Sequence, residues 1–361
     1  MSYTETKDLF VVSDIHGHAS ELFAALDEAG FDSKNSRHVL VSCGDHFDRG
    51  SESRAVLRYL RTLKNKILLR GNHEVILENI LARGFLRPID RRNGVEKTVT
   101  AFFGRNCMDS DGRLYVDPRD RRDILDFLDS TYDYFETEHY VFAHGWLPLE
   151  QDEDGYSTLP ANWRQATREA WRAAAWIKWY EAYRAGGLLP SGKTLVCGHR
   201  TAAYGVDFDP SRSTTDSSIF YGDRMIAIDA CTAVSRRVNV LVLRDEPLRV
   251  PVRHEMKLAC EPFDAILRGE KRVEMRLWDE KRQAVRPHDR IVFTCDGEHC
   301  EVRVLGVHVY PDFASLVDEF DPDELGFPAL SRNAICAYLK LFYTDDQITR
   351  HGTVALRLAR T

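Results

Sequence analysis

Three short loops in the first eighty residues carry side chains that bind metals and transfer protons. They are Asp14 and His16 in SDIHGH, Asp45 and Asp48 in GDHFDRG, and Asn72 and His73 in RGNHE. Carboxylate oxygens, imidazole nitrogens and an amide oxygen form a donor set that suits divalent metals such as manganese, iron or zinc. Two such ions, about 3.5–4 Å apart, activate water and neutralise charge on a phosphoryl group. The residue types therefore indicate phosphoryl chemistry.

Each of these loops follows an apolar run that predicts a buried strand. The runs are residues 8–13, 38–43 and 66–70, and helical patterns follow at 19–30, 51–63 and 73–84. Strands that alternate with helices indicate βαβ units and an α/β fold with a parallel component in its sheet. Because the carboxyl ends of neighbouring parallel strands face one crevice, we expect the three loops to converge there.

Two later histidines extend the pattern. His144 in AHGW and His199 in CGHR also end strand-like runs, and they could complete the coordination of a second ion. Taken singly, such motifs occur by chance, and an aspartate after a strand is often only a helix N-cap. Their order, each at the end of an apolar strand, favours a two-metal site over that simpler interpretation.

Composition narrows the class of protein. The 361 residues are 43% hydrophobic and 29% charged, which is typical of folded proteins, and the net charge of −7 argues against a wholly basic nucleic-acid-binding surface. No apolar run is long enough to span a bilayer, and the N-terminus lacks the layout of a signal peptide. Eight scattered cysteines favour reduced thiols, so we expect a cytoplasmic protein without a membrane partner. No protein partner can be inferred.

The motifs DIHG, GDHFDRG, GNHE, HG and GH, in this order, resemble those of the PPP-type branch of the calcineurin-like metallophosphoesterases. The resemblance covers about residues 8–244 and implies a four-layer α/β/β/α sandwich with two divalent metal ions. We expect manganese before iron or zinc. Asp14 and His16 would hold one ion, and Asp45 would bridge both. The remaining ligands of the second ion would be Asn72, His144 and His199.

The same resemblance implies the catalytic residues. His73 would be the general acid for the leaving oxygen, Asp48 would orient His73, and Arg49 would clamp the phosphoryl oxygens. The implied reaction is hydrolysis of a phosphomonoester or phosphoanhydride by in-line attack of a metal-bridging hydroxide. Physical chemistry agrees, since an imidazole paired with a carboxylate stays protonated near neutral pH and a guanidinium can bind two phosphoryl oxygens. A surface salt bridge is the alternative role for Arg49.

The sequence differs from the eukaryotic protein phosphatases at positions that bear on the identity of the substrate. Those enzymes carry a further phosphate-binding arginine, for which Arg164, Arg168 and Arg172 are only candidates here. The stretch IDACTAVSRRVNVLVL is more similar to the bacterial branch that includes diadenosine tetraphosphatases and polynucleotide end-healing phosphatases. His18 stands where many relatives have glutamine or cysteine. We expect His18 to face solvent at the start of a helix rather than the site.

Two other segments of the first domain have open roles. Residues 85–118 form an insertion that could be a lid, a partner site or scaffold. Residues 160–185 are strongly helical and aromatic, and their spacing predicts one helical face made of Trp176, Trp179, Tyr180 and Tyr183. We expect this face to pack on the core, and the alternative is a lid whose aromatic rings stack on a base.

A second, mostly β domain follows two prolines in EPLRVPVR, so we place the domains at 1–247 and 254–361. PFDAILRGEKRVEMRLWDEKRQ, IVFTC, VYPDFASLV and FYTDDQITRHGTVALRL resemble an ASCH domain, a small PUA-like β-barrel. The resemblance implies recognition of RNA or a modified nucleoside, with Lys271, Glu274 and Arg276 lining the cleft. Members that deacetylate cytidine have threonine where Glu274 stands, which favours binding over catalysis.

Two local features of this domain bear on its turns. Asp296-Gly297, between Cys295 and Cys300, predicts a hairpin turn rather than a zinc site. His288 stands where the related domains usually have glycine.

The sequence therefore predicts a metal-dependent phosphoesterase for a nucleotide or RNA-linked substrate, which the barrel helps to hold. A protein serine/threonine phosphatase is the first alternative. An RNA-binding protein with a structural metal site, or an acetylated-nucleoside amidohydrolase centred on Lys271, is the second.

Overall fold

A computed structural model describes residues 3–186 and 188–360, which divide into two compact units. The first unit holds the residues up to 159 and residues 172–250, and the second holds residues 160–171 and those from 251 onward. The segment 160–171, which the sequence pattern places inside the first domain, thus packs with the second.

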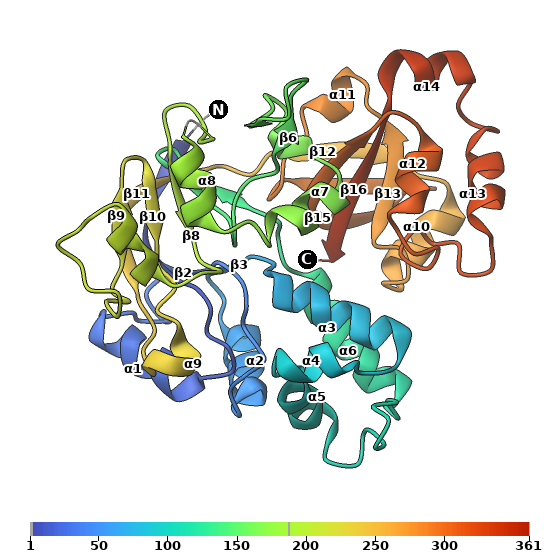
Figure 1. Ribbon diagram of the computed structural model, residues 1–361. Coiled ribbons are helices and arrows are strands. Elements are labelled where there is room, and N and C mark those ends of the chain that lie inside the picture. The colour runs from blue at the N-terminus through green and yellow to red at the C-terminus, as the bar shows by residue number, and fades with distance from the viewer. Residues whose placement is uncertain (1–2, 187, 361) are drawn as a thin grey trace. The chain divides into compact units, whose positions relative to one another are not determined.

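Two sheets organise the first unit (Figure 1). One sheet has the order β11-β1-β2-β3, with bounds Leu241–Arg249, Tyr3–Val12, His38–Ser42 and Lys66–Leu68. The other has the order β4-β5-β8-β10-β9, with bounds Phe135–Glu136, Tyr140–Phe142, Thr194–Cys197, Met225–Ala227 and Phe220–Gly222. β1, β2 and β3 run parallel, as do β5, β8 and β10. The expected α/β class is confirmed. A separate hairpin pairs β6 (Glu150–Gln151) with β7 (Ser157–Thr158).

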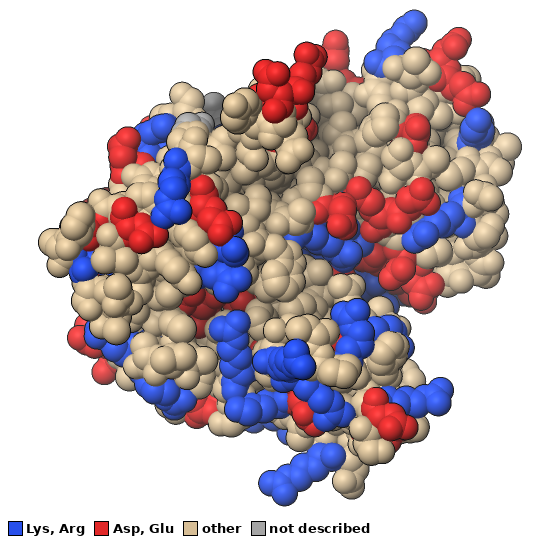
Figure 2. Space-filling model, in the orientation of Figure 1, with Lys and Arg blue, Asp and Glu red and all other residues tan. Residues whose placement is uncertain are grey.

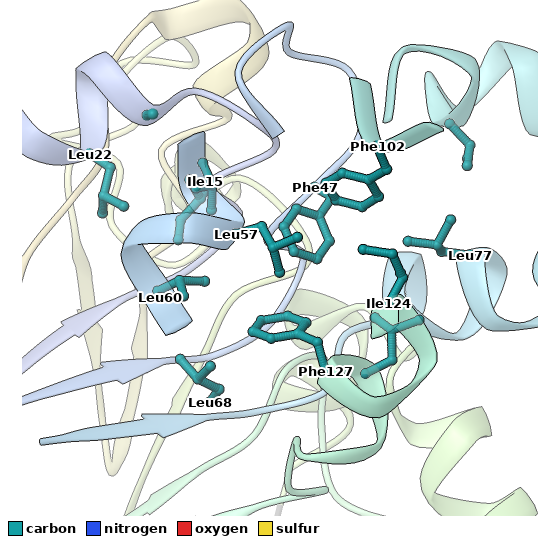
Figure 3. Packing of buried hydrophobic residues seen from close by; sticks show 14 of the residues in the cluster. Ile15, Leu22, Phe47, Leu57, Leu60, Leu68, Leu77, Phe102, Ile124 and Phe127 are labelled. Atoms are coloured by element: carbon teal, nitrogen blue, oxygen red, sulfur yellow. The ribbon is translucent and has the colours of Figure 1, made fainter. Parts of the chain in front are cut away.

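Three helices share one apolar core with the strands of the four-stranded sheet. They are α1 (Ala19–Glu28), α2 (Ser53–Thr62) and α3 (Asn72–Arg83). Their buried residues recur at helical spacing, such as Val56, Leu57 and Leu60 in α2, because only one stripe of each helix faces the core. Figure 3 shows Leu57 and Leu60 directed into this core together with Phe47.

The insertion at 85–118 is part of this core rather than a loose loop. It contains α4 (Pro88–Arg92) and α5 (Val95–Phe103), and α6 (Pro118–Asp129) follows. The ring centroid of Phe102 lies 5.1 Å from that of Phe47 in an edge-to-face contact, which Figure 3 shows.

The aromatic segment does not form one continuous helix as expected. It breaks into a 3₁₀ turn (Trp163–Gln165), α7 (Arg168–Ala174) and α8 (Trp179–Ala185). Trp176 lies in the intervening turn and is 48% exposed, whereas Trp179 is fully buried and stacks on Phe220 at 5.4 Å. Core packing is therefore confirmed for Trp179, and the expected common face with Trp176 is wrong.

A curled five-stranded sheet forms the second unit (Figure 1). Its order is β12-β14-β15-β16-β13, with bounds Arg253–Lys257, Arg290–Cys295, Glu298–Tyr310, Thr353–Arg360 and Val273–Leu277. Two apolar clusters pack on it, one with α10 (Cys260–Leu267) and the other with α12 (Phe313–Asp318) and α13 (Arg332–Leu339). Two further short helices are α11 (Glu280–Gln283) and α14 (Asp345–His351).

The predicted hairpin turn between β14 and β15 is confirmed. Asp296 and Gly297 have φ values of 47° and 86°, as a two-residue turn of this type requires. His288, at the position where glycine is usual, also has a left-handed φ of 73°. Cys295 forms a disulfide with Cys260, so the expectation of reduced thiols is wrong for this pair. The other six cysteines are free.

On the face shown in Figure 2, basic side chains gather over the lower part of the first unit, with a few acidic side chains among them. None of the helices in the described part of the chain has the length and apolarity needed to cross a bilayer.

Candidate metal centre

The loops after β1, β2 and β3 converge as predicted. The backbone N–H of His16 donates to the carbonyl of Asp45 at 2.9 Å, and that of Asp14 donates to Gly44 at 3.1 Å. Gly71 has no room for a β-carbon, which would collide with the side chain of Asp45. A glycine is therefore required where the third loop passes the second.

Backbone strain is concentrated in these loops. Of the twelve non-glycine residues with positive φ in the described ranges, six are Asp14, His16, Asp45, Asp48, Arg49 and His199. Each such conformation costs of order 1–3 kcal/mol and persists only where the surrounding fold enforces it. The fold thus holds these side chains in positions that the isolated chain would avoid.

One group of candidate ligands surrounds His16. Its Nε2 atom lies 3.8 Å from Oδ1 of Asp14 and 3.6 Å from Oδ2 of Asp45. Its Nδ1 atom donates to the carbonyl of Phe47 at 3.0 Å. This hydrogen bond fixes the tautomer and leaves the Nε2 lone pair directed at the carboxylates.

A second group surrounds His144. Its Nε2 atom lies 2.9 Å from Oδ1 of Asn72 and 3.3 Å from Oδ1 of Asp45. Its Nδ1 atom donates to the carbonyl of Cys43 at 2.8 Å, so the Nε2 lone pair again points inward. The ring of His199 lies 5.2 Å from that of His144. The two groups, which share Asp45, together contain all six predicted ligands.

These groups fit divalent ions. Two ligand atoms that share an ion at about 2.0–2.2 Å lie roughly 3–3.6 Å apart, close to most of the distances above. Within the described residues, Nε2 of His16 and Nε2 of His199 are buried without a hydrogen-bond partner. Burial, reinforced by His144, lowers the pKa of His199 to about 2, and burial also holds the pKa of His16 well below its usual value. Both imidazoles are thus neutral, which is the form that binds a metal.

His73, Asp48 and Arg49 also meet. Nδ1 of His73 lies 2.7 Å from Oδ2 of Asp48, and Nε2 lies 3.2 Å from a guanidinium nitrogen of Arg49. Burial alone would lower the pKa of His73, but Asp45 and Asp48 outweigh it and raise the pKa to about 9. Arg49 opposes this rise, because its positive charge disfavours a second cation beside it. The two carboxylates have the larger effect on the pKa, so the protonated form of His73 is favoured.

The insertion supports this loop. Oγ1 of Thr98, in α5, accepts a hydrogen bond from the backbone N–H of Asp48 at 2.8 Å, and Thr98 is fully buried. Nζ of Lys97 donates to the carbonyl of Arg49 at 2.7 Å, and the carbonyl of Gly94 accepts from the N–H of Arg49 at 3.3 Å. The insertion thus serves as scaffold for the Asp48–Arg49 turn.

Glu74 is a positioning residue that the sequence analysis missed. Its buried carboxylate accepts from the backbone N–H groups of Asp45, His46 and Gly71 at 2.8, 2.9 and 2.8 Å, and it pairs with Nδ1 of His46 at 3.0 Å. Burial raises the pKa of Glu74, but His46 and the backbone donors outweigh burial and lower it. Its position as the third residue of a helix, typical of a capping box, was the available signal.

Other predicted positions lie elsewhere. His18 is only 6% exposed, with Nδ1 accepting from Arg236 at 2.8 Å, so the expected solvent-facing position is wrong. Among the residues that the structure describes, each of the three candidate arginines contacts a side chain outside the metal centre. Arg164 lies over Trp163, Arg168 pairs with Glu324, and Arg172 pairs with Glu78.

The three predicted cleft residues of the second unit do come together. Nζ of Lys271 donates to the carbonyl of Leu325 at 2.8 Å and lies 3.4 Å from Oε2 of Glu274. Oε1 of Glu274 lies 2.7 Å from Nε of Arg276. Burial lowers the pKa of Lys271, and Glu274 opposes that effect.

Comparison with known families agrees with this geometry. The model of the calcineurin-like phosphoesterases matches residues 8–224, and that of the ASCH domain matches residues 256–359. The first match spans more than half of the chain, so the chain belongs to the calcineurin-like phosphoesterase family and carries a C-terminal ASCH domain. Its class is that of the metal-dependent phosphohydrolases.

Among curated proteins, the chain is similar to symmetrical bis(5′-nucleosyl)-tetraphosphatases. It is 37% identical over 75 residues to that of Wigglesworthia glossinidia brevipalpis, covering 20% of this chain and 27% of the relative. It is 34% identical over 71 residues to that of Coxiella burnetii (strain Dugway 5J108-111), covering 20% and 24%. The chain thus spans about a quarter of the length of these relatives. A solved cold-active protein-tyrosine phosphatase of a psychrophilic Shewanella sp. is 16% identical, covering 67% of this chain and 77% of that chain, with a TM-score of 0.42.

Proposed function

We propose that this chain is a two-metal hydrolase that cleaves a phosphomonoester or phosphoanhydride in a nucleotide or RNA-linked substrate. A dinucleoside polyphosphate is the first substrate class to test, because the curated relatives are named for that activity. The observation that carries the proposal is the orientation of Asp45. Its Oδ2 faces His16 at 3.6 Å while its Oδ1 faces His144 at 3.3 Å, as a carboxylate that bridges two ions must.

The proposed ligands divide between two ions. Asp14 and His16 would hold one, Asp45 would join both, and the second would also take Asn72, His144 and His199. When bound, two divalent ions supply an activated water molecule and offset the negative charge that builds on the phosphoryl group. Manganese is the first metal we propose, with iron or zinc as alternatives.

The protein's own side chains would handle the leaving group. The hydrogen bond from Nδ1 of His73 to Asp48 leaves Nε2 as the nitrogen that can release a proton. That proton would pass to the leaving oxygen of the substrate. Arg49, beside Nε2, would turn its guanidinium from His73 to the phosphoryl oxygens and bind two of them.

Trp176 supports a substrate with a base. Its indole is 48% exposed and lies edge-on to the candidate ligand His199, with ring centroids 6.1 Å apart. Base–aromatic stacking contributes about 1–3 kcal/mol per base. The position of Trp176 therefore suits a nucleotide whose phosphate occupies the metal centre.

For the ASCH domain we propose a binding role. The ammonium of Lys271 is buried and already engaged by Leu325 and Glu274, so it is not available as a base for amide hydrolysis. Lys271, Glu274 and Arg276 would then shape a recognition cleft. RNA or a nucleoside remains the proposed ligand class.

The test is hydrolysis with Mn²⁺ of diadenosine tetraphosphate, 5′-triphosphate RNA, 2′,3′-cyclic RNA ends, p-nitrophenyl phosphate and a phosphothreonine peptide. Nucleotide and RNA products are separated by chromatography, because cleavage of an internal phosphoanhydride or a cyclic phosphate frees no inorganic phosphate. Phosphate release is measured for the other substrates. We expect turnover of a nucleotide or RNA end, together with about two metal ions per chain by elemental analysis. The Asp45→Asn variant should lose both the turnover and the bound metal, because the carboxylate of Asp45 is the proposed ligand of both ions. Turnover of the peptide alone would favour the protein phosphatase alternative. No turnover of any substrate by metal-loaded protein would refute the proposal.

A further inference from the structure

A cavity of about 430 Å³ opens among α2, α5 and α6 of the first unit. Its apolar lining comes from Leu57, Phe102 and Ile124, and its basic rim comes from Arg54, Arg58 and Arg61. Figure 3 shows the three apolar side chains directed toward one another from the three helices. None of the six is a candidate metal ligand or catalytic residue, so the cavity is distinct from the metal centre.

The three arginines of the rim differ in whether their guanidinium groups already have partners. Arg61 pairs with Asp123 at 2.8 Å, and Arg54 donates to the carbonyl of Phe102 at 3.2 Å. Arg58 is exposed, and within the described ranges no hydrogen bond or ion pair engages it. The spacing of 54, 58 and 61 puts all three on one face of α2. Arg58 is therefore the cation left to meet an anion.

We propose that this cavity binds a small aromatic anion of the nucleoside monophosphate class. The volume lies in the range of small-ligand sites, about 300–1,000 Å³. The phosphate would meet Arg54 and Arg58, because a guanidinium matches phosphate geometry with paired donors. The flat ring would lie on the apolar lining near Phe103, which is half-buried at the end of α5.

Two carboxylates of α6 also line the cavity and bear on the ring of such a ligand. They belong to Asp120 and Asp123. Asp123 is paired with Arg61, whereas the described residues include no partner for the side chain of Asp120. Its carboxylate can accept from an amino group of the ring. A plain phosphate would use only the arginines, so the carboxylate of Asp120, unpaired among the described residues, favours an anion that carries a ring with a donor.

The experiment is calorimetric titration of the full chain, freed of metal with a chelator, using AMP, adenosine and inorganic phosphate as probes. We expect AMP to bind more tightly than either of the others. Arg58→Glu should weaken AMP binding by about tenfold or more, since charge-assisted hydrogen bonds are about twice as strong as neutral ones. Lys34→Glu makes the same change of charge on an exposed loop residue and should leave AMP binding unchanged.

Equal AMP affinity in the Arg58→Glu and Lys34→Glu variants would overturn the proposal, and so would the absence of AMP binding to the parent chain. If inorganic phosphate binds as tightly as AMP, the ring contributes nothing to binding and the proposed ligand class is wrong. Matched midpoints of thermal unfolding establish that both variants are folded. Binding at the metal centre itself would be insensitive to Arg58, so the two sites are distinguished.

Discussion

Nδ1 of His73 lies 2.7 Å from Oδ2 of Asp48, and both side chains are buried. A carboxylate in this position orients the ring and favours its protonated form. In the proposed function Nε2 of His73 would release the proton, so we expect the contribution of the pair to depend on the leaving group.

We expect His73→Gln to lower kcat by about 10²-fold or more on a nucleotide substrate, within the range usual for a general acid. The loss on p-nitrophenyl phosphate should be smaller, because nitrophenolate leaves without a proton. Steady-state kinetics on both substrates, with metal content measured in parallel, provide the comparison. Equal losses on the two substrates would contradict the role of His73 as an acid.

Thr98 offers a test of the insertion. Thr98→Val removes the acceptor for the backbone N–H of Asp48, and an unsatisfied buried group costs about 1–3 kcal/mol. We expect kcat to fall by roughly tenfold as the Asp48–Arg49 turn loosens, with metal content unchanged. Thr98→Ser should restore most of the activity, and Thr100→Val, in the same helix, is the control. A serine variant as impaired as the valine variant would point to packing rather than to the hydroxyl.

The two neighbouring tryptophans should separate substrate binding from stability. Trp176→Ala removes an exposed ring and should raise KM for a dinucleotide roughly tenfold, while p-nitrophenyl phosphate turnover stays within about twofold. Trp179→Ala empties a buried site and should destabilise the protein by about 3–5 kcal/mol. Chemical denaturation and kinetics on both substrates distinguish the two effects. If Trp176→Ala impairs both substrates equally, base stacking is excluded.

Arg168 should matter to the stability of the second unit. Its guanidinium holds both carboxylate oxygens of Glu324, at 2.8 and 3.1 Å, and its backbone N–H donates to the hydroxyl of Tyr310. Removing one partner of a buried pair costs about 3–5 kcal/mol, so Arg168→Ala should lower Tm clearly. Arg184→Ala breaks an exposed pair with Asp207 and should cost about 0–1 kcal/mol. Similar losses in the two variants would show that burial adds nothing here.

The site could be predicted from the sequence because its residues lie in motifs directly after predicted strands. Asp14, Asp45 and Asn72 each follow a strand, so motif and strand pattern together place them at one edge of a sheet. Sequence motifs also carry His73 and Asp48, whose contact the structure shows at 2.7 Å. Whether these residues hold metal or transfer protons stays a prediction for the experiments above.

What the sequence could not provide depends on distant contacts. His18 is covered by Arg236, 218 residues away, and nothing near His18 in the sequence signals that cover. Thr98 lies 50 residues from Asp48, in an insertion without a motif. The disulfide of Cys260 with Cys295 spans 35 residues and has no diagnostic spacing. In each case the partner is set by tertiary packing, which local patterns do not encode.

The segment 160–171 has an evolutionary consequence. Because it belongs to the second unit while residues 172–250 belong to the first, the chain passes between the units three times rather than once. A recombination event that exchanged only residues from 251 onward would leave behind the residues that meet Tyr310, Glu319 and Glu324. An exchange of the second unit would therefore have to include residues 160–171 to keep these three contacts.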